Sequence, residues 1–171
     1  MKGPIALAAA AALAACATAP ATATPPPPSA GAMLKGPAGE NLGEARFQQT
    51  PTGLVIDVEV RGLTPGWHGM HVHEKGDCSA KDFTSAGAHV GHAEHGFLTM
   101  SGGEAGDLPN IWVGADGMGK AQAYTTRLSL GPDSLWDADT AALVIHAARD
   151  DHYTQPIGGS GARVACGVVT H

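Results

Sequence analysis

The sequence predicts an all-β domain, arranged as an antiparallel sandwich or barrel. Three observations lead to this fold class. Apolar and polar residues alternate over residues 54–61, a period of two that places one face inward and the other outward. Residues 115–118 (Ala-Asp-Gly-Met) form a turn signal between two extended stretches. The 171 residues include 24 Gly and 12 Pro, and no stretch has the periodicity of an amphipathic helix.

The expected strands follow from this alternation and from the Gly and Pro residues that interrupt it. Residues 62–66 end the first strand with Gly and Pro, and residues 131–133 close the hairpin in the same way. Two segments, 74–109 and 147–162, fit no strand, and structureless segments of that length in a compact domain are usually functional. We expect strands at residues 54–61, 67–73, 110–114, 119–130, 141–146 and 163–169.

The N-terminus reads as an export signal followed by a lipid attachment site. Residues 5–15 are an uninterrupted apolar run of 11 residues, which is typical of a secretory signal. The run is too short to span a bilayer, which needs about 20 residues. It ends in Leu13-Ala14-Ala15-Cys16, which resembles the lipobox of bacterial lipoproteins. The alternative is an ordinary signal that is cut a few residues later, so that Cys16 is discarded.

The chain therefore divides into three parts. We expect a signal peptide at residues 1–15, a lipidated Cys16 with a tether over residues 16–31, and the folded domain at residues 32–171. The tether is rich in Pro and uncharged, so it cannot bury a core. Ala17 is not acidic, which favours sorting to the outer membrane. The expected location is the periplasm, with a lipid anchor in a bacterial membrane.

The charge balance excludes one large class of partners. The formal net charge is −6, and loss of Lys2 with the signal would leave nine basic against 16 acidic residues, a charge of −7. A nucleic-acid binder needs a basic surface to collect phosphates. Aromatic residues make up only 5% of the chain, too few for stacking platforms along a single strand. We therefore expect no nucleic-acid partner.

All nine histidines lie between residues 68 and 171, and their spacing predicts a metal site. His71 and His73 share one face of an expected strand, whereas His68 faces the other way and is expected to be structural. A single histidine is usually an ordinary core or surface residue, but six of them lie within residues 68–95. Imidazole and carboxylate groups are ligands that divalent metals such as zinc and copper prefer. The further candidates are His89, His92, His95, Asp107 and His146.

Several fragments, in order between residues 40 and 170, resemble the copper/zinc superoxide dismutase family. His68-Gly-Met-His71-Val-His73-Glu is similar to the copper-ligand strand of that family, and Thr84-Ser-Ala-Gly-Ala-His89 to the segment of its bridging histidine. The resemblance implies an eight-stranded antiparallel Greek-key barrel or sandwich with two long functional loops. It also implies an enzyme that converts superoxide to O₂ and H₂O₂. The other fragments are Gly76-Asp-Cys78, Gly106-Asp107-Leu-Pro-Asn110, Val144-Ile-His146 and Gly158-Gly-Ser-Gly-Ala-Arg163-Val-Ala-Cys166-Gly-Val.

The resemblance also implies roles for individual residues. His89 would bridge copper and zinc through its two ring nitrogens and carry a proton in the cycle, and Arg163 would attract the anion beside copper. Asp107 would be a zinc ligand, and Asp150 would hydrogen-bond one ligand histidine on each metal. Cys78 would form a disulfide with Cys166, the alternatives being two free thiols or Cys78 as a soft copper ligand. The copper ligands would be His71, His73, His89 and His146.

The zinc ligands depart from the family pattern of three histidines and one aspartate. The position three residues before Asp107 holds Glu104 instead of a histidine, and His95 lies two residues closer to His89 than the family spacing. His92 has no counterpart in the pattern. Three outcomes stay open. Glu104 substitutes as a ligand, or His92 and His95 both bind zinc together with His89 and Asp107, or the site is weak and the enzyme uses copper alone.

The function expected from these residues is dismutation of superoxide at a copper site. The alternative in another class is a non-catalytic periplasmic lipoprotein that binds copper or zinc on the same fold, and a third reading is a dismutase-like module with a dead site. Intact candidates for every copper ligand and for Arg163 favour the enzyme. The sequence is compatible with a monomer or with a homodimer.

Overall fold

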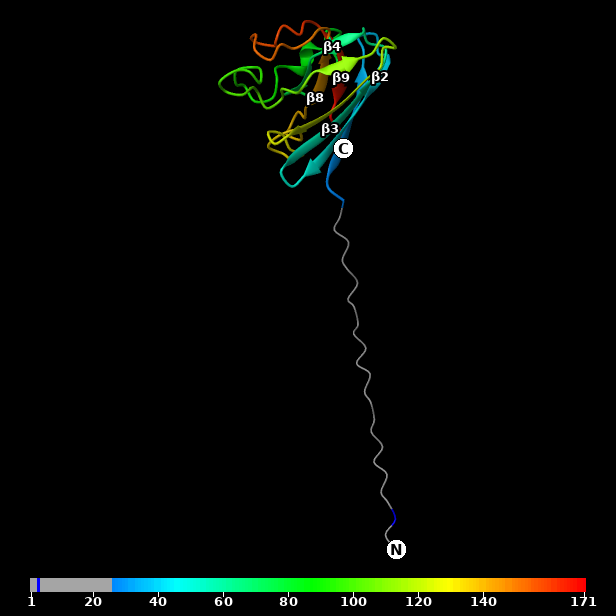
Figure 1. Ribbon diagram of the computed structural model, residues 1–171, viewed down its shortest axis with the longest axis vertical. Coiled ribbons are helices and arrows are strands. Elements are labelled where there is room, and N and C mark those ends of the chain that lie inside the picture. The colour runs from blue at the N-terminus through cyan, green and yellow to red at the C-terminus, as the bar shows by residue number, and fades with distance from the viewer. Residues whose placement is uncertain (1–2, 4–25) are drawn as a thin grey trace.

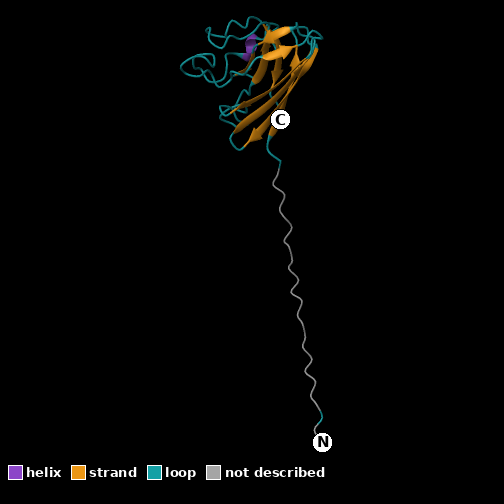
Figure 2. Ribbon diagram, viewed as in Figure 1, coloured by secondary structure: helices purple, strands orange, loops and turns teal. Residues whose placement is uncertain are grey.

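The computed structural model describes Gly3 and residues 26–171, and these residues form an antiparallel β-barrel (Figures 1 and 2). One sheet contains nine strands in the order β4-β6-β7-β3-β2-β1-β9-β8-β5. The expected all-β class is thus confirmed. The strands are β1 (Ser29–Lys35), β2 (Asn41–Thr50), β3 (Gly53–Val60), β4 (Gly66–His68), β5 (Met70–His73), β6 (Ile111–Val113), β7 (Gly119–Thr125), β8 (Ala142–His146) and β9 (Arg163–Val168), and the helical element among the described residues is the 3-10 turn η1 (Thr84–Ala86).

The barrel nearly closes because one segment of the chain supplies both edges of the sheet. β4 pairs with β6 and β5 pairs with β8, yet only Gly69 separates β4 from β5. The backbone N–H of Gly69 donates to the carbonyl oxygen of Ala148 rather than to a strand. The chain therefore changes partner at this residue. The family resemblance implies eight strands, and the structure has nine because this break divides one of them.

Each segment expected to form a strand contains one, and two further strands precede them. The strand expected at residues 119–130 is too long, because β7 ends at Thr125. Leu128 and Leu130, which extended the apolar pattern, pack into the core from the loop that follows. The hairpin between β6 and β7 closes where the N–H of Gly114 donates to the carbonyl of Met118. β1 and β2 were not expected, because their pairing skips Leu42 and the alternation shifts there. Gly43, with a φ of 140°, carries this irregularity, and its backbone lies close to β3. The alternation of buried and exposed residues starts only at Gly43, so a period of two does not run through the whole of β2.

The ordered domain begins at β1, ahead of residue 32, where we expected it to begin. Ala30 pairs with Phe47, and Gly31 pairs with Arg46, because small residues fit against the neighbouring strand. Residues 1–2 and 4–25, which contain the expected signal and Cys16, lie outside the described residues. In the described part of the chain, no helix is long and apolar enough to cross a bilayer.

The apolar core fills the barrel and thereby decides which side chains point outward. Met70 and Val72 of β5 and Ile145 of β8 are fully buried inside it. Burial of each such side chain stabilises the fold by about 1.5–3 kcal/mol. Since neighbours on a strand face opposite sides, His71 and His73 project from the outer face of the barrel.

Two long loops, residues 74–110 and 147–162, cover this outer face and lie on the same side of the barrel (Figure 2). The first loop is fastened by a small apolar cluster outside the main core. A disulfide between Cys78 and Cys166, with an S–S distance of 2.01 Å, ties the same loop to β9. The expected disulfide is therefore confirmed. The apolar cluster consists of Phe83, Ala86, Ala142, Val144 and Cys166.

Candidate metal centre

Two strands and one loop bring four imidazoles together on the outer face of the barrel. β5 pairs with β8 so that His71 lies opposite Val144, and His73 lies opposite Ala142. The first loop then runs back along β5, where the N–H of Val90 donates to the carbonyl of Val72. We call His71, His73, His89 and His146 the four-histidine cluster; all four are buried, and one ring nitrogen from each lies within 4.8 Å of the others.

Each ring of the cluster is oriented by a hydrogen bond from its other nitrogen. Nδ1 of His73 donates to the carbonyl of Gly87 at 2.9 Å, and Nδ1 of His146 donates to the carbonyl of Gly161 at 3.0 Å. Nε2 of His71 donates to Asp150 Oδ2 at 2.7 Å. These partners fix the tautomers and leave the other nitrogen of each ring turned toward the remaining rings of the cluster. We call these the inward nitrogens.

The inward nitrogens have no hydrogen-bond partner. In the described residues, seven buried side-chain N or O atoms lack a partner, and four of them belong to this cluster. An unpartnered buried polar atom costs free energy, so native proteins contain few of them. Four converging imidazole nitrogens are a donor set that suits copper. The atoms are Nδ1 of His71 and Nε2 of His73, His89 and His146.

Burial keeps three of the four imidazoles neutral, those of His71, His73 and His146. It lowers the pKa of His71 to about 3, with the neighbouring imidazoles acting in the same direction. Burial, together with His89 and Arg163, lowers the pKa of His73 to about 2. Burial also lowers the pKa of His146 to about 4. Their lone pairs are therefore available at neutral pH without loss of a proton.

A second group lies on the far side of His89, and we call it the mixed cluster: His89, His95, Glu104 and Asp107. Asp107 Oδ1 lies 3.1 Å from Nδ1 of His89 and 2.9 Å from Nδ1 of His95. Glu104 Oε2 lies 2.8 Å from Nδ1 of His89. His89 therefore faces the four-histidine cluster with one nitrogen and the mixed cluster with the other.

The mixed cluster is charged in the absence of a metal. Although burial opposes it, hydrogen bonds to Asp107 and Asp150 raise the pKa of His95 to about 10. Hydrogen bonds from His89, His95 and two backbone N–H groups outweigh burial and hold the pKa of Asp107 well below its usual range. Burial raises the pKa of Glu104. Carboxylate and imidazole donors in this arrangement suit zinc.

Asp150 connects the two clusters. Its Oδ2 accepts from Nε2 of His71 at 2.7 Å, and its Oδ1 accepts from Nε2 of His95 at 3.1 Å. The side chain is completely buried, and these bonds outweigh burial in lowering its pKa. The side chain of Asn110 holds the backbone of Asp150. Asn110 Oδ1 accepts from the Asp150 N–H, and Asn110 Nδ2 donates to the Asp150 carbonyl.

Arg163 lies beside the four-histidine cluster and is held by the first loop. Its guanidinium donates to the carbonyl of Phe83 at 2.6 Å and to the carbonyl of Gly87 at 2.7 Å. The Gly87 carbonyl also accepts from His73, so one backbone group positions both side chains. Burial lowers the pKa of Arg163, but a guanidinium stays charged at any pH of interest.

The structure brings together every site residue expected from the sequence within the described chain except His92. The side chain of His92 is 73% exposed, and its Nε2 lies 3.2 Å from Glu74 Oε2, outside both clusters. It follows Gly91 in a turn where both residues have positive φ angles, which direct the ring away from Asp107. Glu104 is the additional side chain that reaches His89 instead.

Some positioning groups escaped sequence reasoning. The carbonyls of Gly87 and Gly161 are backbone atoms, which leave no side-chain signal in a sequence. Asn110 belonged to a recognised fragment but had no assigned role. His68 is buried with its ring nitrogens against the carbonyls of Thr64 and His146, at 2.8 and 2.7 Å, in keeping with a structural role.

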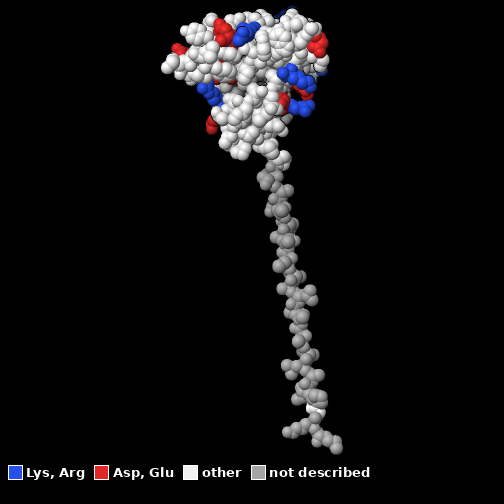
Figure 3. Space-filling view, viewed as in Figure 1, with Lys and Arg blue, Asp and Glu red and all other residues white. Residues whose placement is uncertain are grey.

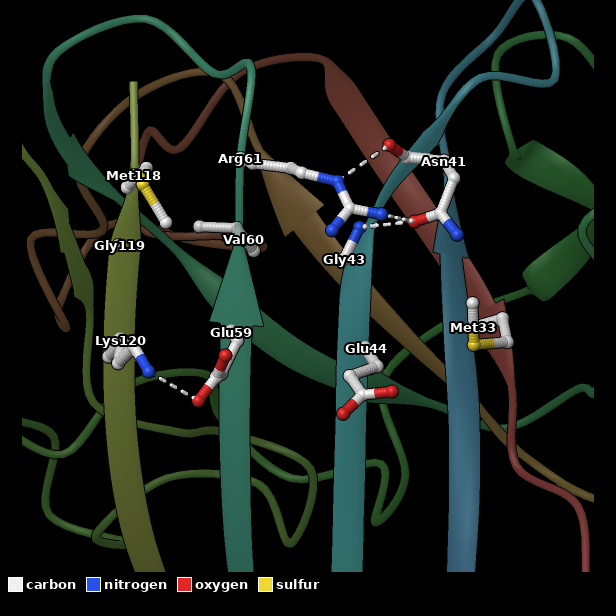
Figure 4. A pocket seen from close by; sticks show the side chains of 10 residues that line it. All are labelled: Met33, Asn41, Gly43, Glu44, Glu59, Val60, Arg61, Met118, Gly119 and Lys120. Carbon is white, nitrogen blue, oxygen red and sulfur yellow. Dashed lines mark hydrogen bonds and ion pairs between the residues drawn. The ribbon is translucent and has the colours of Figure 1, made fainter. Parts of the chain in front are cut away.

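A hollow on the outer face of β1, β2, β3 and β7 offers no alternative site (Figure 4). Lys120 Nζ donates to Glu59 Oε1 at 2.6 Å, and Arg61 Nη2 donates to Asn41 Oδ1 at 2.7 Å. These polar groups pair with one another rather than converging on the hollow. None of its lining residues belongs to either histidine cluster.

Comparison with known proteins agrees with this arrangement. The family profile described as copper/zinc superoxide dismutase (SODC) matches residues 41–169. A superoxide dismutase (Cu-Zn) of Caulobacter vibrioides is 49% identical over 148 residues, which cover 82% of this chain and 85% of that protein. A second relative, superoxide dismutase (Cu-Zn) 2 of Aquifex aeolicus, is 36% identical over 146 residues, with coverage of 82% and 85%.

Solved structures show the same fold. A SOD-like protein from Bacillus subtilis superposes with a TM-score of 0.77 at 37% identity, covering 82% of this chain and 97% of that one. The Cu/Zn superoxide dismutase from Brucella abortus gives a TM-score of 0.70 at 30% identity, with coverage of 84% and 100%.

Proposed function

The chain belongs to the copper/zinc superoxide dismutase family, and on this premise we propose that it converts superoxide to O₂ and H₂O₂ with copper and zinc as its metals. The observation that carries the proposal is the set of four unpartnered nitrogens in the four-histidine cluster, with Arg163 beside them. A non-catalytic metal-binding lipoprotein is not favoured, since it would not need the guanidinium.

The residues present fit a copper ion. We assign His71, His73, His89 and His146 as its ligands, because each turns a buried nitrogen without a hydrogen-bond partner toward the others. When bound, copper would supply the one-electron chemistry, accepting an electron from one superoxide and returning it to the next. Asp150 and the carbonyls of Gly87 and Gly161 hold the rings in place from behind.

Arg163 attracts and orients the substrate anion. The chain carries a formal charge of −6, so its overall field repels superoxide. On the face seen in Figure 3, acidic and basic side chains occur in small groups of both signs. Local charge must therefore reverse the repulsion at the site, and Arg163 provides it next to His73.

His89 moves the proton that the reduced product needs. Its Nε2 faces the four-histidine cluster without a partner, while its Nδ1 faces the mixed cluster beside Asp107 and Glu104. The ring can therefore take a proton at Nε2 and donate it to the reduced anion without losing its orientation. Water supplies the second proton of H₂O₂.

The residues of the mixed cluster fit zinc. His89, His95 and Asp107 converge with distances of 2.9 and 3.1 Å between the aspartate oxygen and the ring nitrogens. Zinc has no redox chemistry, so its role is to hold the ring of His89 and to order the first loop. His95 is oriented in turn by Asp150.

A dismutase assay on metal-loaded protein tests the proposal. The account predicts activity in proportion to bound copper. Copper uptake without dismutation would support the non-catalytic alternative. Absence of copper uptake would exclude dismutation and leave that alternative with zinc alone.

The proposal extends to location and assembly. Export and lipid attachment at Cys16 are supported by the apolar run of residues 5–15 and by Leu13-Ala14-Ala15 before the cysteine. The wild-type protein should fractionate with the periplasmic side of the membrane, with the outer membrane favoured, and Cys16→Ala should release it. Recovery of wild-type protein in the soluble fraction, with Cys16 absent from the mature chain, would contradict the anchor.

Light scattering of the released domain distinguishes a monomer from a homodimer.

A further inference from the structure

The mixed cluster contains a second carboxylate besides Asp107, that of Glu104. We propose that Glu104 is a zinc ligand, so that two histidines and two carboxylates hold the metal in this chain. The inference rests on the proposed function, because it concerns the zinc site of the same centre. It departs from the three histidines and one aspartate that the family resemblance implies.

The geometry places Glu104 in the cluster. Its Oε2 lies 2.8 Å from Nδ1 of His89 and 3.9 Å from Nδ1 of His95. These are the same nitrogens that approach Asp107 Oδ1. The glutamate side chain is only 11% exposed. Glutamates are rarely so buried unless their carboxylate is paired with another group.

The backbone around Glu104 is built to hold it there. Its N–H donates to Asp107 Oδ2 at 2.9 Å, and its carbonyl accepts from the Asp107 N–H at 3.2 Å. Arg127 Nη1 donates to the carbonyls of Gly103 and Glu104 at 2.7 and 3.4 Å. Gly103 has a φ of 92°, and a Cβ there would lie 2.8 Å from Asp107 Oδ2. The turn therefore presents both carboxylates on the same side.

The other candidates for the position are engaged elsewhere. His92 is 73% exposed and lies against Glu74. His71 comes close to the mixed cluster, but its Nε2 is bound to Asp150 and its Nδ1 is one of the unpartnered nitrogens of the four-histidine cluster. Glu104 is the remaining donor within reach of both Nδ1 atoms.

Two carboxylates change the character of the site. When both are ionised, their charge of −2 balances Zn²⁺, and zinc binds carboxylate oxygen at about 2.0–2.2 Å, close to its distance to imidazole nitrogen. A glutamate can therefore take the place of a histidine without a change in the size of the site. The loss of one imidazole is the feature that an experiment can detect.

Zinc K-edge X-ray absorption of the wild-type protein, loaded with copper and zinc, tests the ligand set directly. The edge is specific for zinc, and scattering from imidazole rings counts the histidines. We expect two imidazoles with the remaining donors oxygen. Three imidazoles would overturn the inference and would favour His92 as a ligand.

Zinc affinity, measured by competition with a chelator, provides a second test. Glu104→Gln should weaken zinc binding at least roughly tenfold, because changes even behind the ligands cost about 10–100-fold. Glu94→Gln removes an exposed carboxylate from the same loop and should bind zinc like the wild type, as should His92→Ala. Glu104→His should restore the affinity lost in Glu104→Gln.

Copper content and dismutation measured on the same samples separate this inference from the proposed function. Wild-type zinc affinity in Glu104→Gln would overturn the role of Glu104 while an active copper site leaves the proposed function intact. If the protein takes up no copper but its zinc spectrum shows two imidazoles, the proposed function would be overturned and the role of Glu104 would stand.

Discussion

The two clusters share His89 but satisfy their polar atoms in different ways. In the four-histidine cluster, four buried ring nitrogens converge and none has a hydrogen-bond partner. In the mixed cluster, carboxylates and imidazoles hydrogen-bond to one another, and a proton on His95 offsets part of the negative charge. The four-histidine cluster therefore needs a cation to give its nitrogens a partner. The mixed cluster pairs its polar atoms without a metal, with a proton on His95.

Because of this difference, metals compete with protons to a different extent in the two clusters. A cation entering the four-histidine cluster displaces no proton from His71, His73 or His146, because burial already keeps those three rings neutral. A cation entering the mixed cluster must displace the proton of His95. Zinc binding should therefore depend more steeply on pH than copper binding.

The largest expected effect is the acid sensitivity of the metal-free protein. The pKa values of His71, His73 and His146 lie at about 3, 2 and 4, below their ordinary value of 6.5. As the pH falls from 6.5 toward 4, the unfolded chain takes up protons that the folded chain excludes. The free energy of unfolding should then decrease by about 1.4 kcal/mol per pH unit for each histidine.

His95 has the opposite sign. Its pKa is raised to about 10, so its contribution is fully present below pH 6.5 and is lost as the pH rises toward 10. Urea unfolding of metal-free protein between pH 4 and pH 10 measures both the loss of stability at low pH and the loss at high pH. Unchanged stability between pH 7 and 5 would contradict the neutral burial of the four-histidine cluster.

Removal of one ligand from each cluster sharpens the comparison. His73→Gln should reduce copper affinity and dismutation by more than roughly 100-fold, because the lost group is itself a ligand rather than an outer partner. His95→Gln should instead reduce zinc content and leave copper bound. His171→Gln serves as control, since His171 is exposed and stacks on Trp136. Equal loss of both metals in the two variants would break the distinction between the clusters.

Asp150 is the point at which the clusters are joined. Asp150→Asn keeps the shape of the side chain but cannot accept hydrogen bonds from both His71 and His95 at full strength. We expect zinc affinity to fall about 10–100-fold, and copper to remain bound at saturating concentration. The exposed neighbour offers the control Asp151→Asn. Unaltered zinc affinity in Asp150→Asn would show that Asp150 does not couple the two sites.

The smallest effect concerns Arg163, which lies beside only one cluster. Arg163→Ala should slow turnover roughly tenfold and flatten its dependence on salt, because the local attraction is lost. The content of both metals should not change. Arg163→Lys should retain part of the rate, and Arg46→Ala removes the same charge from an exposed position on β2. A wild-type rate in Arg163→Ala would remove this residue from the mechanism.

The four-histidine cluster could be predicted further from the sequence than the mixed cluster. The parity of a strand is a local property, and His71 and His73 do lie together in the four-histidine cluster, while the ring of His68 contacts two backbone carbonyls outside it. The position of Glu104 depends on distant contacts, among them the bonds from Arg127. Spacing along the chain could not show which of His92 and Glu104 turns toward His89.

The same reason explains the unexpected strands. β3 alternates regularly and could be read directly, but β2 is irregular at Leu42 and Gly43, and β1 consists largely of small residues. Their register is set by pairing with neighbours rather than by their own pattern. The expected loops were easier to identify, because long stretches without any strand pattern are uncommon.

Titration of metal-free protein with Cu²⁺, followed by electron paramagnetic resonance, shows whether the four-histidine cluster binds copper. The account predicts one tightly bound copper per chain whose spectrum shows nitrogen donors, in numbers that match the four-histidine cluster, and dismutation that rises with its occupancy. Failure of the folded protein to bind copper tightly, or a spectrum with oxygen donors alone, would contradict it.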